Sequence, residues 1–453
     1  MRVTGPVINL SEGFSQNNDI FSRKPLFDLI MRFVKKSPDN GLVLAIDDKW
    51  GNGKTTFLKM MHSEINNDEN SDINVIYYDA FENDYHTDPF VSLASEIYQS
   101  LDEGKTKFEK VKKSFVETGK KVGANLLKGG VNYAVTTLTG GLVSGNALDS
   151  AKDKITSSIS EPLEKYVEEK LITGKSEKGD LKNFKEVMEK IYNDGGKKTL
   201  FIIDELDRAR PDFSLDLLEK IKHIFSVEGF VFLLAVNREQ FEKSIERRYG
   251  SIDSKTYLNK FVHYWFTLPK INTLSPKCSN RYTRSTMSIQ LSQLDRGTNI
   301  ISRNGGIELT LAYLLDINGC SLREAERCYS LIASIDNCTA INNFSSYTYH
   351  ALMALVSFLK VTNNKLLNDI RYKVISKEIA IDKLGITEDR VMTQMDAGQI
   401  VHILDYHYAS EEELNKAREG KLFSDIEHFH YGSARRELFD EMSDIIDFLH
   451  IGN

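Results

Sequence analysis

An apolar run that leads directly into a glycine-containing loop constrains the fold of this chain more than any other stretch. Leu42 to Ile46 is apolar throughout, and it is followed by Trp50-Gly51-Asn52-Gly53-Lys54-Thr55-Thr56 and then by a helix-like pattern. Strand, glycine loop, Lys-Thr and helix together are the context of a phosphate-binding P-loop. Glycine lets backbone amides turn toward an anion, and the N-terminus of the following helix adds a favourable dipole. The stretch therefore predicts a nucleotide-binding α/β domain.

Each residue of this loop has a role in the expected site. Lys54 is placed to reach the β- and γ-phosphates, and the Thr55 hydroxyl is placed to help hold Mg²⁺. The rest of the expected cradle consists of Trp50, Gly51, Asn52, Gly53 and Thr56. The pattern G-x-x-x-x-G-K-[ST] is broken at one position, because its first glycine falls on Asp48. The motif alone also leaves a chance Gly-Lys-Thr turn open.

A second apolar run ends in two adjacent carboxylates. Thr199 to Ile203 predicts a buried strand that delivers Asp204 and Glu205 to its carboxyl end. Asp204 is placed to hold Mg²⁺, and Glu205 is the natural base or water-orienting group for attack on the γ-phosphate. An acidic turn after a strand is common by itself. Together with the P-loop, however, it predicts binding and hydrolysis of a nucleoside triphosphate.

Two further strands end in polar residues that belong at the same edge of a parallel sheet. Phe230 to Val236 leads into Asn237, whose amide is placed to contact the γ-phosphate or the attacking water. Ile73 to Tyr78 leads into Asp79 and Glu82. These two carboxylates either orient water at the nucleotide or cap the next turn, and the cap is the interpretation we favour.

Composition excludes several other classes of protein. A chain of 453 residues with 41% hydrophobic and 27% charged residues is typical of a soluble globular protein of two or three domains. The net charge of −7 argues against a broadly basic surface, so nucleic acid is not indicated as a partner. The N-terminus lacks the apolar core of a signal peptide, and the four cysteines form no CxxC motif. These features favour a cytoplasmic protein.

The order of these patterns predicts a nucleotide-binding core that is split by an insertion and followed by a helical domain. We expect residues 1–103 and 181–270 to form the core, 104–180 to form the insertion, and 271–453 to form the C-terminal helical domain, joined through the polar stretch 277–304. Helical spacing of apolar residues predicts helices over 159–172, 181–193, 307–315, 322–335, 347–360 and 434–449.

The insertion has an unusual composition. Residues 104–128 contain eight lysines and two glutamates, and residues 129–146 contain no charge. The uncharged stretch has the length of a short membrane span but is rich in glycine, so it is too weakly apolar for a confident transmembrane assignment. A surface-binding hairpin that contacts a membrane peripherally, a mobile lid and a partner-binding arm remain open, beside a flexible insertion that packs on its own protein.

One helix of the C-terminal domain carries a candidate site residue. Ser321-Leu322-Arg323-Glu324 has the pattern of a helix that begins at a serine cap. From such a helix, acting as a lid, Arg323 is in a position to reach a bound nucleotide. An exposed, salt-bridged helix face is the alternative.

Five segments together resemble the KAP family of P-loop NTPases. They read, in order, WGNGKTTF, YYDAFEND, IIDELDRARPDF, AVNREQF and YLNKFVHYWFTLP. The resemblance covers roughly residues 17–270 and, more weakly, the helix that begins SLREAER. It implies the P-loop class that has an additional strand between the P-loop and Walker B strands, related to the AAA+ and STAND ATPases. Family members often carry an insertion, in many cases a pair of membrane helices, where this chain has residues 104–180. Bacterial relatives often resemble phage-exclusion or defence proteins.

The resemblance also implies roles for individual residues. It makes Asp204 the Walker B aspartate, Glu205 the catalytic glutamate and Asn237 the first sensor. The remaining implied roles are phosphate and Mg²⁺ binding by Lys54 and Thr55, a second sensor at Arg323, and an arginine finger acting in trans at Arg208 or Arg210. A finger in trans would make hydrolysis depend on assembly of a homo-oligomer.

The sequence thus predicts a Mg²⁺-dependent ATPase, or an NTPase for another nucleotide, that works as a switch or an assembly ATPase. Its expected partners are the nucleotide, further copies of the chain and an effector protein encoded beside it. A non-hydrolysing nucleotide-binding scaffold and a membrane-peripheral effector are the competing predictions. Asp48 favours the first of these, and the lysine-rich stretch favours the second.

Overall fold

The computed structural model describes residues 8–37, 41–86, 88–101, 106–127, 163–271, 285–302, 305–338, 347–427 and 439–440. The uncharged stretch 129–146 lies outside these ranges. So does the helix predicted over 434–449, apart from residues 439–440.

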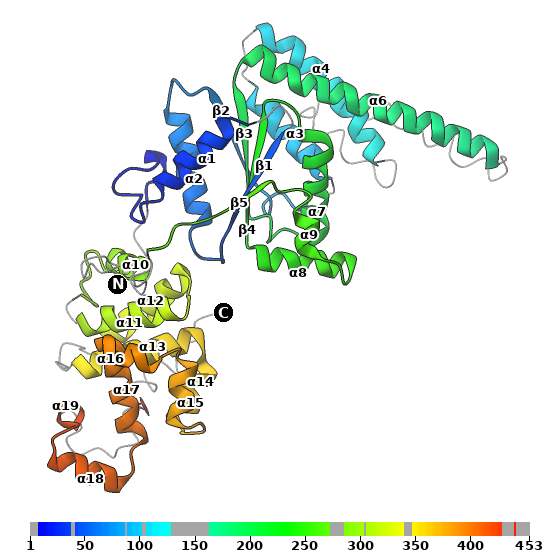
Figure 1. The fold of residues 1–453 in the computed structure, drawn as a ribbon. Coiled ribbons are helices and arrows are strands. Elements are labelled where there is room, and N and C mark those ends of the chain that lie inside the picture. The colour runs from blue at the N-terminus through cyan, green and yellow to red at the C-terminus, as the bar shows by residue number, and fades with distance from the viewer. Residues whose placement is uncertain are drawn as a thin grey trace.

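The core of the protein is a five-stranded parallel sheet with the strand order β2-β3-β4-β1-β5 (Figure 1). The strands are β1 (Leu42–Asp47), β2 (Ile73–Asp79), β3 (Lys198–Asp204), β4 (Phe230–Val236) and β5 (Tyr264–Thr267). Strand β4 lies between the P-loop strand β1 and the acidic strand β3, which confirms the predicted additional-strand class of P-loop fold. The pairing also brings the carboxyl ends of β1, β3 and β4 to one edge of the sheet.

Helices cover both faces of the sheet, because side chains alternate between the two faces along each strand. On β3, Leu200 and Ile202 pack with helices α1 (Lys24–Lys35) and α2 (Lys54–Asn67). The intervening Phe201 and Ile203 face the other layer. That layer contains α3 (Pro89–Ser100), α7 (Pro211–Lys220), α8 (Arg238–Tyr249) and α9 (Ser254–Leu258), and a single π-helical turn, Ile221–Phe225, continues α7. The short helix η1 (Leu10–Glu12) packs beside α2.

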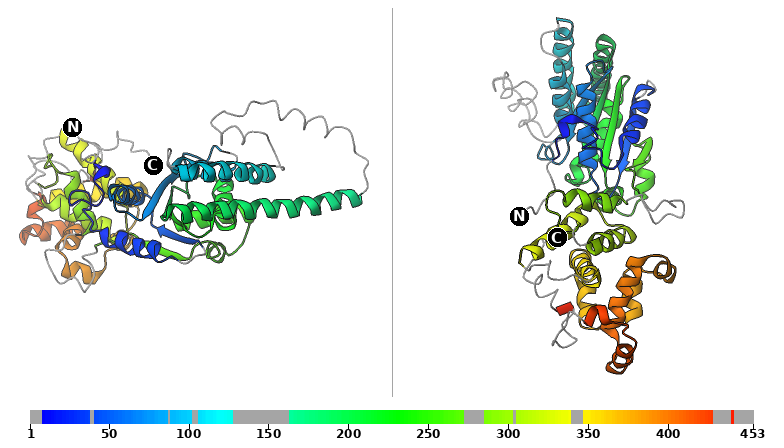
Figure 2. Two further views of the ribbon diagram at one scale, coloured as in Figure 1. Left: turned by 90° about the horizontal axis from the view of Figure 1, so that it is seen from above. Right: turned by 90° about the vertical axis from the view of Figure 1, so that its left-hand side faces the viewer.

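Two long helices project from the core (Figure 2). Helix α4 (Thr106–Leu127) packs against α6 (Leu163–Gly195), with the rings of Phe115 and Phe184 5.2 Å apart. We predicted two helices where α6 is a single one, and that prediction is wrong. The glycines between the predicted helices weaken a helix without ending it, whereas a proline would break it. Among the described helices, none combines the length and apolar character needed to cross a bilayer.

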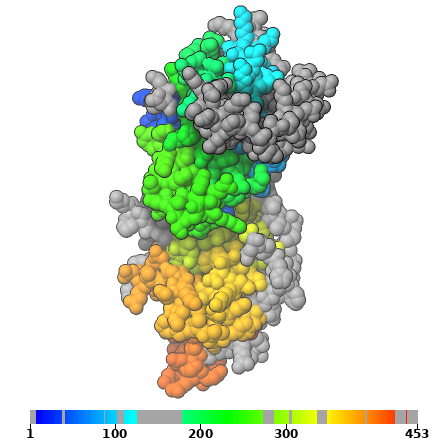
Figure 3. Space-filling model, turned by 90° about the vertical axis from the view of Figure 1, so that its right-hand side faces the viewer, coloured from blue at the N-terminus to red at the C-terminus, as the bar shows by residue number. Residues whose placement is uncertain are grey.

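The region after β5 is helical, as predicted, and it has a hydrophobic core of its own. Figure 3 shows its surface, coloured yellow to orange, beside the green surface of the α/β core. Its helices are α10 (Thr286–Leu294), α11 (Gly305–Ile317), α12 (Leu322–Cys338), α13 (Tyr347–Thr362), α14 (Asn364–Arg371), α15 (Lys377–Lys383), α16 (Glu388–Thr393), α17 (Met395–Tyr408), α18 (Glu411–Glu419) and α19 (Ser424–Glu427). Helix α10 lies within the stretch 277–304 that we predicted to be a polar connection. The Ser285 hydroxyl caps it, and Leu291 and Leu294 are buried.

Candidate functional site

The glycines of the P-loop adopt backbone conformations that side chains rarely allow. Gly51 and Gly53 have φ angles of +84° and +83°, in the left-handed region that glycine enters at little cost. A Cβ on Gly51 would lie 2.6 Å from the Cβ of Arg323, so the approach of the helical domain also requires glycine there. Gly53 then starts α2, whose first residues line the cavity described next.

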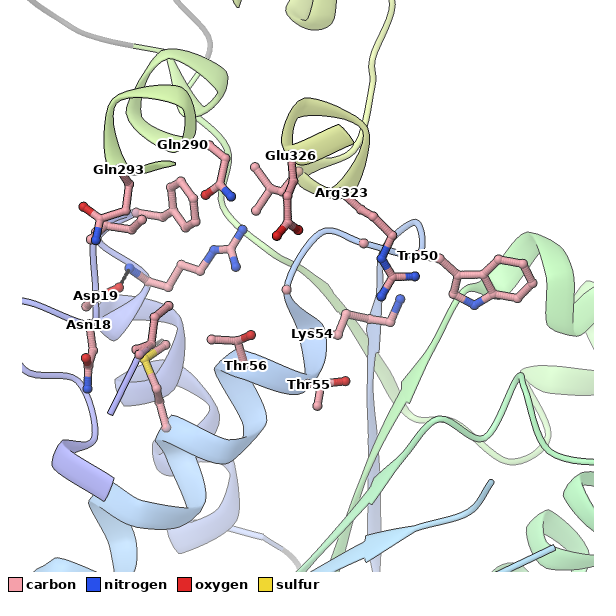
Figure 4. Close-up of a pocket in the computed structure, with 18 of the residues that line it drawn as sticks. Asn18, Asp19, Trp50, Lys54, Thr55, Thr56, Gln290, Gln293, Arg323 and Glu326 are labelled. Atoms are coloured by element: carbon pink, nitrogen blue, oxygen red, sulfur yellow. Dashed lines mark hydrogen bonds between the residues drawn. The ribbon is translucent and has the colours of Figure 1, made fainter. Parts of the chain in front are cut away.

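A cavity of about 410 Å³ lies between the P-loop and the helical domain (Figure 4). Its volume falls within the range of roughly 300–1,000 Å³ that is usual for ligand pockets. The P-loop side contributes Trp50, Gly51, Gly53, Lys54, Thr55 and Thr56, and the helical domain contributes Gln290, Gln293, Leu294, Leu322, Arg323 and Glu326. Residues 18–21 and Arg23 of the N-terminal segment, together with Glu205 and Arg208, form much of the remaining wall. The structure therefore brings most of the predicted site residues to one hollow.

Lys54 is buried at the bottom of the loop, with 8% of its surface exposed. Its Nζ donates to the carbonyl oxygen of Asp48 at 2.5 Å and to that of Lys49 at 3.3 Å. Burial lowers the pKa of Lys54, and the carboxylates of Asp207 and Asp48 oppose that shift most strongly. In Figure 4 the side chains of Lys54 and Arg323 project toward the same part of the cavity. The P-loop thus places the Lys54 ammonium, with carboxylates near it, where the motif predicts that phosphate binds.

Strand β3 delivers Asp204 and Glu205 to the edge of the sheet, as predicted. Asp204 is 1% exposed, and it accepts hydrogen bonds from the Tyr77 hydroxyl at 2.7 Å and from the Glu205 amide at 2.8 Å. Burial beside this carboxylate raises the pKa of Tyr77. Tyr77 stands on the neighbouring strand β2 and holds Asp204 in place, and no motif in the sequence marks it for that role.

Glu205 leaves the strand in a left-handed conformation, with φ of +55°, and its side chain lines the cavity. Its Oε1 accepts from Arg208 Nη1 at 2.5 Å, so the two side chains form an ion pair within one chain. Burial is the main cause that raises the pKa of Glu205, and the Arg208 charge opposes it. The predicted base is therefore paired with one of the two predicted arginine fingers.

The other predicted finger, Arg210, holds the loop after β2. Its backbone and side chain donate to the carboxylate and carbonyl of Asp84 and to the carbonyl of His86. A role in trans for either arginine stays a prediction. Asp79, the last residue of β2, accepts from the amides of Phe81 and Glu82, so it caps the turn, as we favoured from the sequence.

Asn237 lies at the carboxyl end of β4 and is not part of the cavity wall. Its Oδ1 accepts from the Gln240 amide at 3.4 Å and caps α8, while its own amide donates to Asp207 at 2.9 Å. The same carboxylate of Asp207 accepts from the Trp50 indole. Asp207 therefore ties the P-loop and the sensor strand together, a connection that the sequence did not predict. The sensor role of Asn237 stays a prediction.

Helix α12 begins directly on the P-loop. Its Ser321 and Glu324 form the expected cap, with the Ser321 amide donating to Glu324 at 2.6 Å. The amide of Arg323 donates to the Gly51 carbonyl at 3.2 Å, and that of Leu322 donates to the Asn52 side chain at 3.3 Å. The first turn of a helix has amides without partners inside the helix, and here the P-loop supplies acceptors for two of them.

Several wall residues were not among the predicted site residues. They include Asp19 and Arg23 before α1 and Gln290 and Gln293 on α10. Asp19 lies ahead of the N-cap residue of α1, which is Arg23, so it does not stand at the usual cap position. Its carboxylate nevertheless accepts from the amides of Arg23 at 2.6 Å and Lys24 at 2.9 Å at the start of the helix. The glutamines were missed because α10 itself was not predicted.

Asp48, which replaces the first glycine of the motif, turns away from the cavity. Its side chain is only 6% exposed, and its Oδ1 accepts from the Lys49 amide at 2.8 Å, from the Asn52 side chain and from Lys270 Nζ at 3.1 Å. It lines a separate hollow, of about 520 Å³, beside Asn237. The carboxylate therefore serves as a fixed acceptor for the P-loop and is not part of the wall of the cavity between the P-loop and the helical domain.

Replacing Asp48 by glycine is expected to weaken nucleotide binding. The change removes the acceptor of Asn52 and adds backbone freedom, and each lost hydrogen bond costs about 0.5–1.5 kcal/mol, more for one to a charged group. Titration with a fluorescent ADP analogue and urea unfolding should show weaker binding and a lower free energy of unfolding. Asp48→Asn keeps an acceptor oxygen, so its nucleotide affinity and its free energy of unfolding should lie between those of Asp48→Gly and the parent. Tighter binding by the glycine variant would contradict this account.

The chain has distant neighbours among solved structures. No curated protein matches the chain. Among solved structures, the chain is similar to the Aeropyrum pernix ORC2 protein in ADPNP–ADP complexes, with 11% identity, a TM-score of 0.34, and 94% of this chain and 93% of that chain covered. It is also similar to the Aeropyrum pernix ORC1 protein in complex with DNA, with 12% identity, a TM-score of 0.32, and 95% and 82% covered.

The family comparison is more specific. The model described as the KAP family P-loop domain matches residues 23–301, a span that contains the P-loop, Asp204, Glu205 and Asn237. The match covers more than half of the chain. The chain is thus a member of the KAP family of P-loop NTPases, with a nucleotide-binding P-loop domain.

Proposed function

We propose that the protein is a Mg²⁺-dependent ATPase whose nucleotide state controls the position of its helical domain. The observation that carries this proposal is the shared cavity, whose walls come from the P-loop, from Glu205 and from helices α10 and α12. The hydrogen bonds from α12 to Gly51 and Asn52 support a coupling between nucleotide binding and the position of the helical domain. A phosphate that reorders the P-loop would also move the acceptors to which α12 is bonded. Bacterial anti-phage defence is the biological context that we propose for this activity.

The residues present fit a bound Mg²⁺ ion. Mg²⁺ prefers oxygen ligands and is usually held by one or two side chains together with substrate phosphates. Thr55 offers a hydroxyl on the cavity wall. Asp204 is not part of that wall and is 1% exposed, but it directly precedes Glu205, which is, and Tyr77 holds the orientation of its carboxylate. A bound Mg²⁺ supplies charge neutralisation on the phosphates. We assign Thr55 and Asp204 to hold it.

The chemistry that we propose for the protein side chains is positioning and charge stabilisation. Lys54 turns from the loop carbonyls toward the β- and γ-phosphates, and the loop amides hold the remaining phosphate oxygens. Glu205 orients the attacking water and takes its proton. Arg323 reaches the phosphates from the helical domain.

A non-hydrolysing nucleotide switch is the second candidate. It is favoured by the ion pair between Glu205 and Arg208, which occupies the carboxylate that would orient water. In the proposed ATPase this pair has to open before hydrolysis. In the switch it stays closed, and release of the nucleotide resets the protein. Further copies of the chain or an effector encoded beside it would be the partner in either case.

Phosphate release by the purified protein separates the two candidates. We expect the protein to hydrolyse MgATP and EDTA to abolish this activity. Without the metal, the phosphate charge is not neutralised, and Thr55 and Asp204 have no ion to hold. The rate should be measured over a range of protein concentrations, since an arginine acting in trans would make it rise with assembly. If the protein bound ADP tightly but released no phosphate from ATP at any protein concentration, the non-hydrolysing switch would be the correct function.

A further inference from the structure

Arg23 is a buried cation without adequate partners, on the wall of the same cavity. It immediately precedes α1, and only 3% of its surface is exposed. Its Nε and Nη2 atoms find no hydrogen-bond partner among the described residues. The guanidinium lies over the ring of Phe21, with Cζ 4.7 Å from the ring centre, so one face is covered by an aromatic side chain.

The carboxylates of Asp48 and Asp19 attract this charge, but neither accepts a hydrogen bond from Nε or Nη2. Both oxygens of Asp19 accept backbone amides at the start of α1, and Asp48 is directed toward Asn52 and Lys270. Burial lowers the pKa of Arg23 to about 10, which still leaves the guanidinium charged at neutral pH. A buried charge with unused donors is unfavourable, and an ion, a water molecule or a ligand is needed to complete its hydrogen bonds.

The position of the guanidinium indicates the part of the ligand that it meets. Its Nη1 lies 3.1 Å from the point where a Cβ on Gly53 would stand, and Leu322 lies 4.0 Å from the same point. Gly53 directly precedes Lys54 in the loop, and the loop amides of a P-loop cradle the α- and β-phosphates. A planar guanidinium with free donors matches two phosphate oxygens at once.

We propose that Arg23 binds the α- and β-phosphates of the nucleotide, as a specificity residue for nucleoside diphosphates and triphosphates. This assignment rests on the proposed nucleotide-binding function. The phosphates would then contact a cation of the P-loop and a cation of the N-terminal segment. The phosphate oxygens would supply the hydrogen-bond acceptors that Arg23 lacks in the protein. This stabilisation would exist only when phosphate is bound.

Arg23→Met is the informative variant, because methionine fills part of the space and removes the charge. We expect its affinity for MgADP and for pyrophosphate to fall by about 10- to 100-fold, the loss typical of hydrogen bonds between charged groups. Its affinity for adenosine should stay unchanged. Without ligand, its melting temperature should equal or exceed that of the parent, because an unsatisfied buried charge has been removed. Arg23→Lys should recover part of the lost affinity.

The control is Arg32→Met, which removes an exposed arginine from α1 and should change neither affinity nor melting temperature. Unchanged MgADP affinity in Arg23→Met would overturn the assignment. An equal loss for adenosine would overturn it as well, because the guanidinium would then hold the base. A lower melting temperature without ligand would show a structural role instead. If the parent protein bound neither MgADP nor pyrophosphate, the proposed function itself would fail.

Discussion

Lys54→Ala is expected to abolish nucleotide binding, with a loss of affinity on the order of 100-fold or more. An alanine removes the ammonium that would pair with the β- and γ-phosphates, and each charge-assisted hydrogen bond contributes about 1.5–3 kcal/mol. It also leaves the carboxylates of Asp204 and Asp207 without the nearby positive charge that offsets them. These carboxylates then repel the phosphates, so the loss should exceed that of the hydrogen bonds alone.

Titration with a fluorescent ADP analogue measures this loss directly. Lys416→Ala is a matched control, because it removes a lysine whose side chain is 74% exposed on α18, away from the cavity. Circular dichroism should show that both variants keep the helical content of the parent. Binding by Lys54→Ala within a few-fold of the parent would mean that the cavity does not receive phosphate at the P-loop.

Glu205→Gln is expected to retain ATP and to slow its hydrolysis by about 100-fold or more, the usual contribution of a general base. Glutamine keeps the size of the side chain but cannot accept the proton of the attacking water. It also weakens the pair with Arg208, which is an ion pair only while residue 205 is charged. Single-turnover measurements with bound ATP separate the slowed chemical step from any change in affinity.

The pH dependence provides a second test of the same residue. Burial raises the pKa of Glu205, so the carboxylate is protonated at a higher pH than an exposed glutamate would be. Hydrolysis by the parent should therefore fall as the pH drops through this raised pKa, and the Glu205→Gln rate should lack that step. Glu412→Gln, at an exposed position of α18, should keep the parental rate and profile. Hydrolysis by Glu205→Gln at the parental rate would show that another group activates the water.

The sequence predicted the parts of the site that are carried by continuous patterns. Strands β1 and β3 contain uninterrupted apolar runs, Leu42–Ile46 and Leu200–Ile203, which are followed by the P-loop and by Asp204, so both their burial and their place in a parallel sheet follow from the sequence. The Ser321 cap was likewise a local pattern, and the structure confirms it. These predictions succeeded because the apolar run or cap residue that defines each element lies within that element's own sequence.

Contacts between distant segments did not follow from such rules. Arg23, Tyr77 and Asp207 gain their positions from segments far away in the chain, and none of them stands in a pattern that reveals its neighbour. Helix α10 was missed because its apolar residues are separated by polar ones that face the cavity. The glycines within α6 suggested a break, but packing of its C-terminal half against α4 supplies more stabilisation than two glycines cost, about 1 kcal/mol each.

The contact between the N-terminus of α12 and the P-loop has a thermodynamic consequence. Free energies that couple two sites are reciprocal, so a change of affinity at one site is matched by an equal change at the other. If phosphate in the loop favours one placement of α12 by a given factor, a macromolecule that selects that placement tightens phosphate binding by the same factor. A partner of the helical domain would then act as a nucleotide-exchange or nucleotide-retention factor without touching the nucleotide.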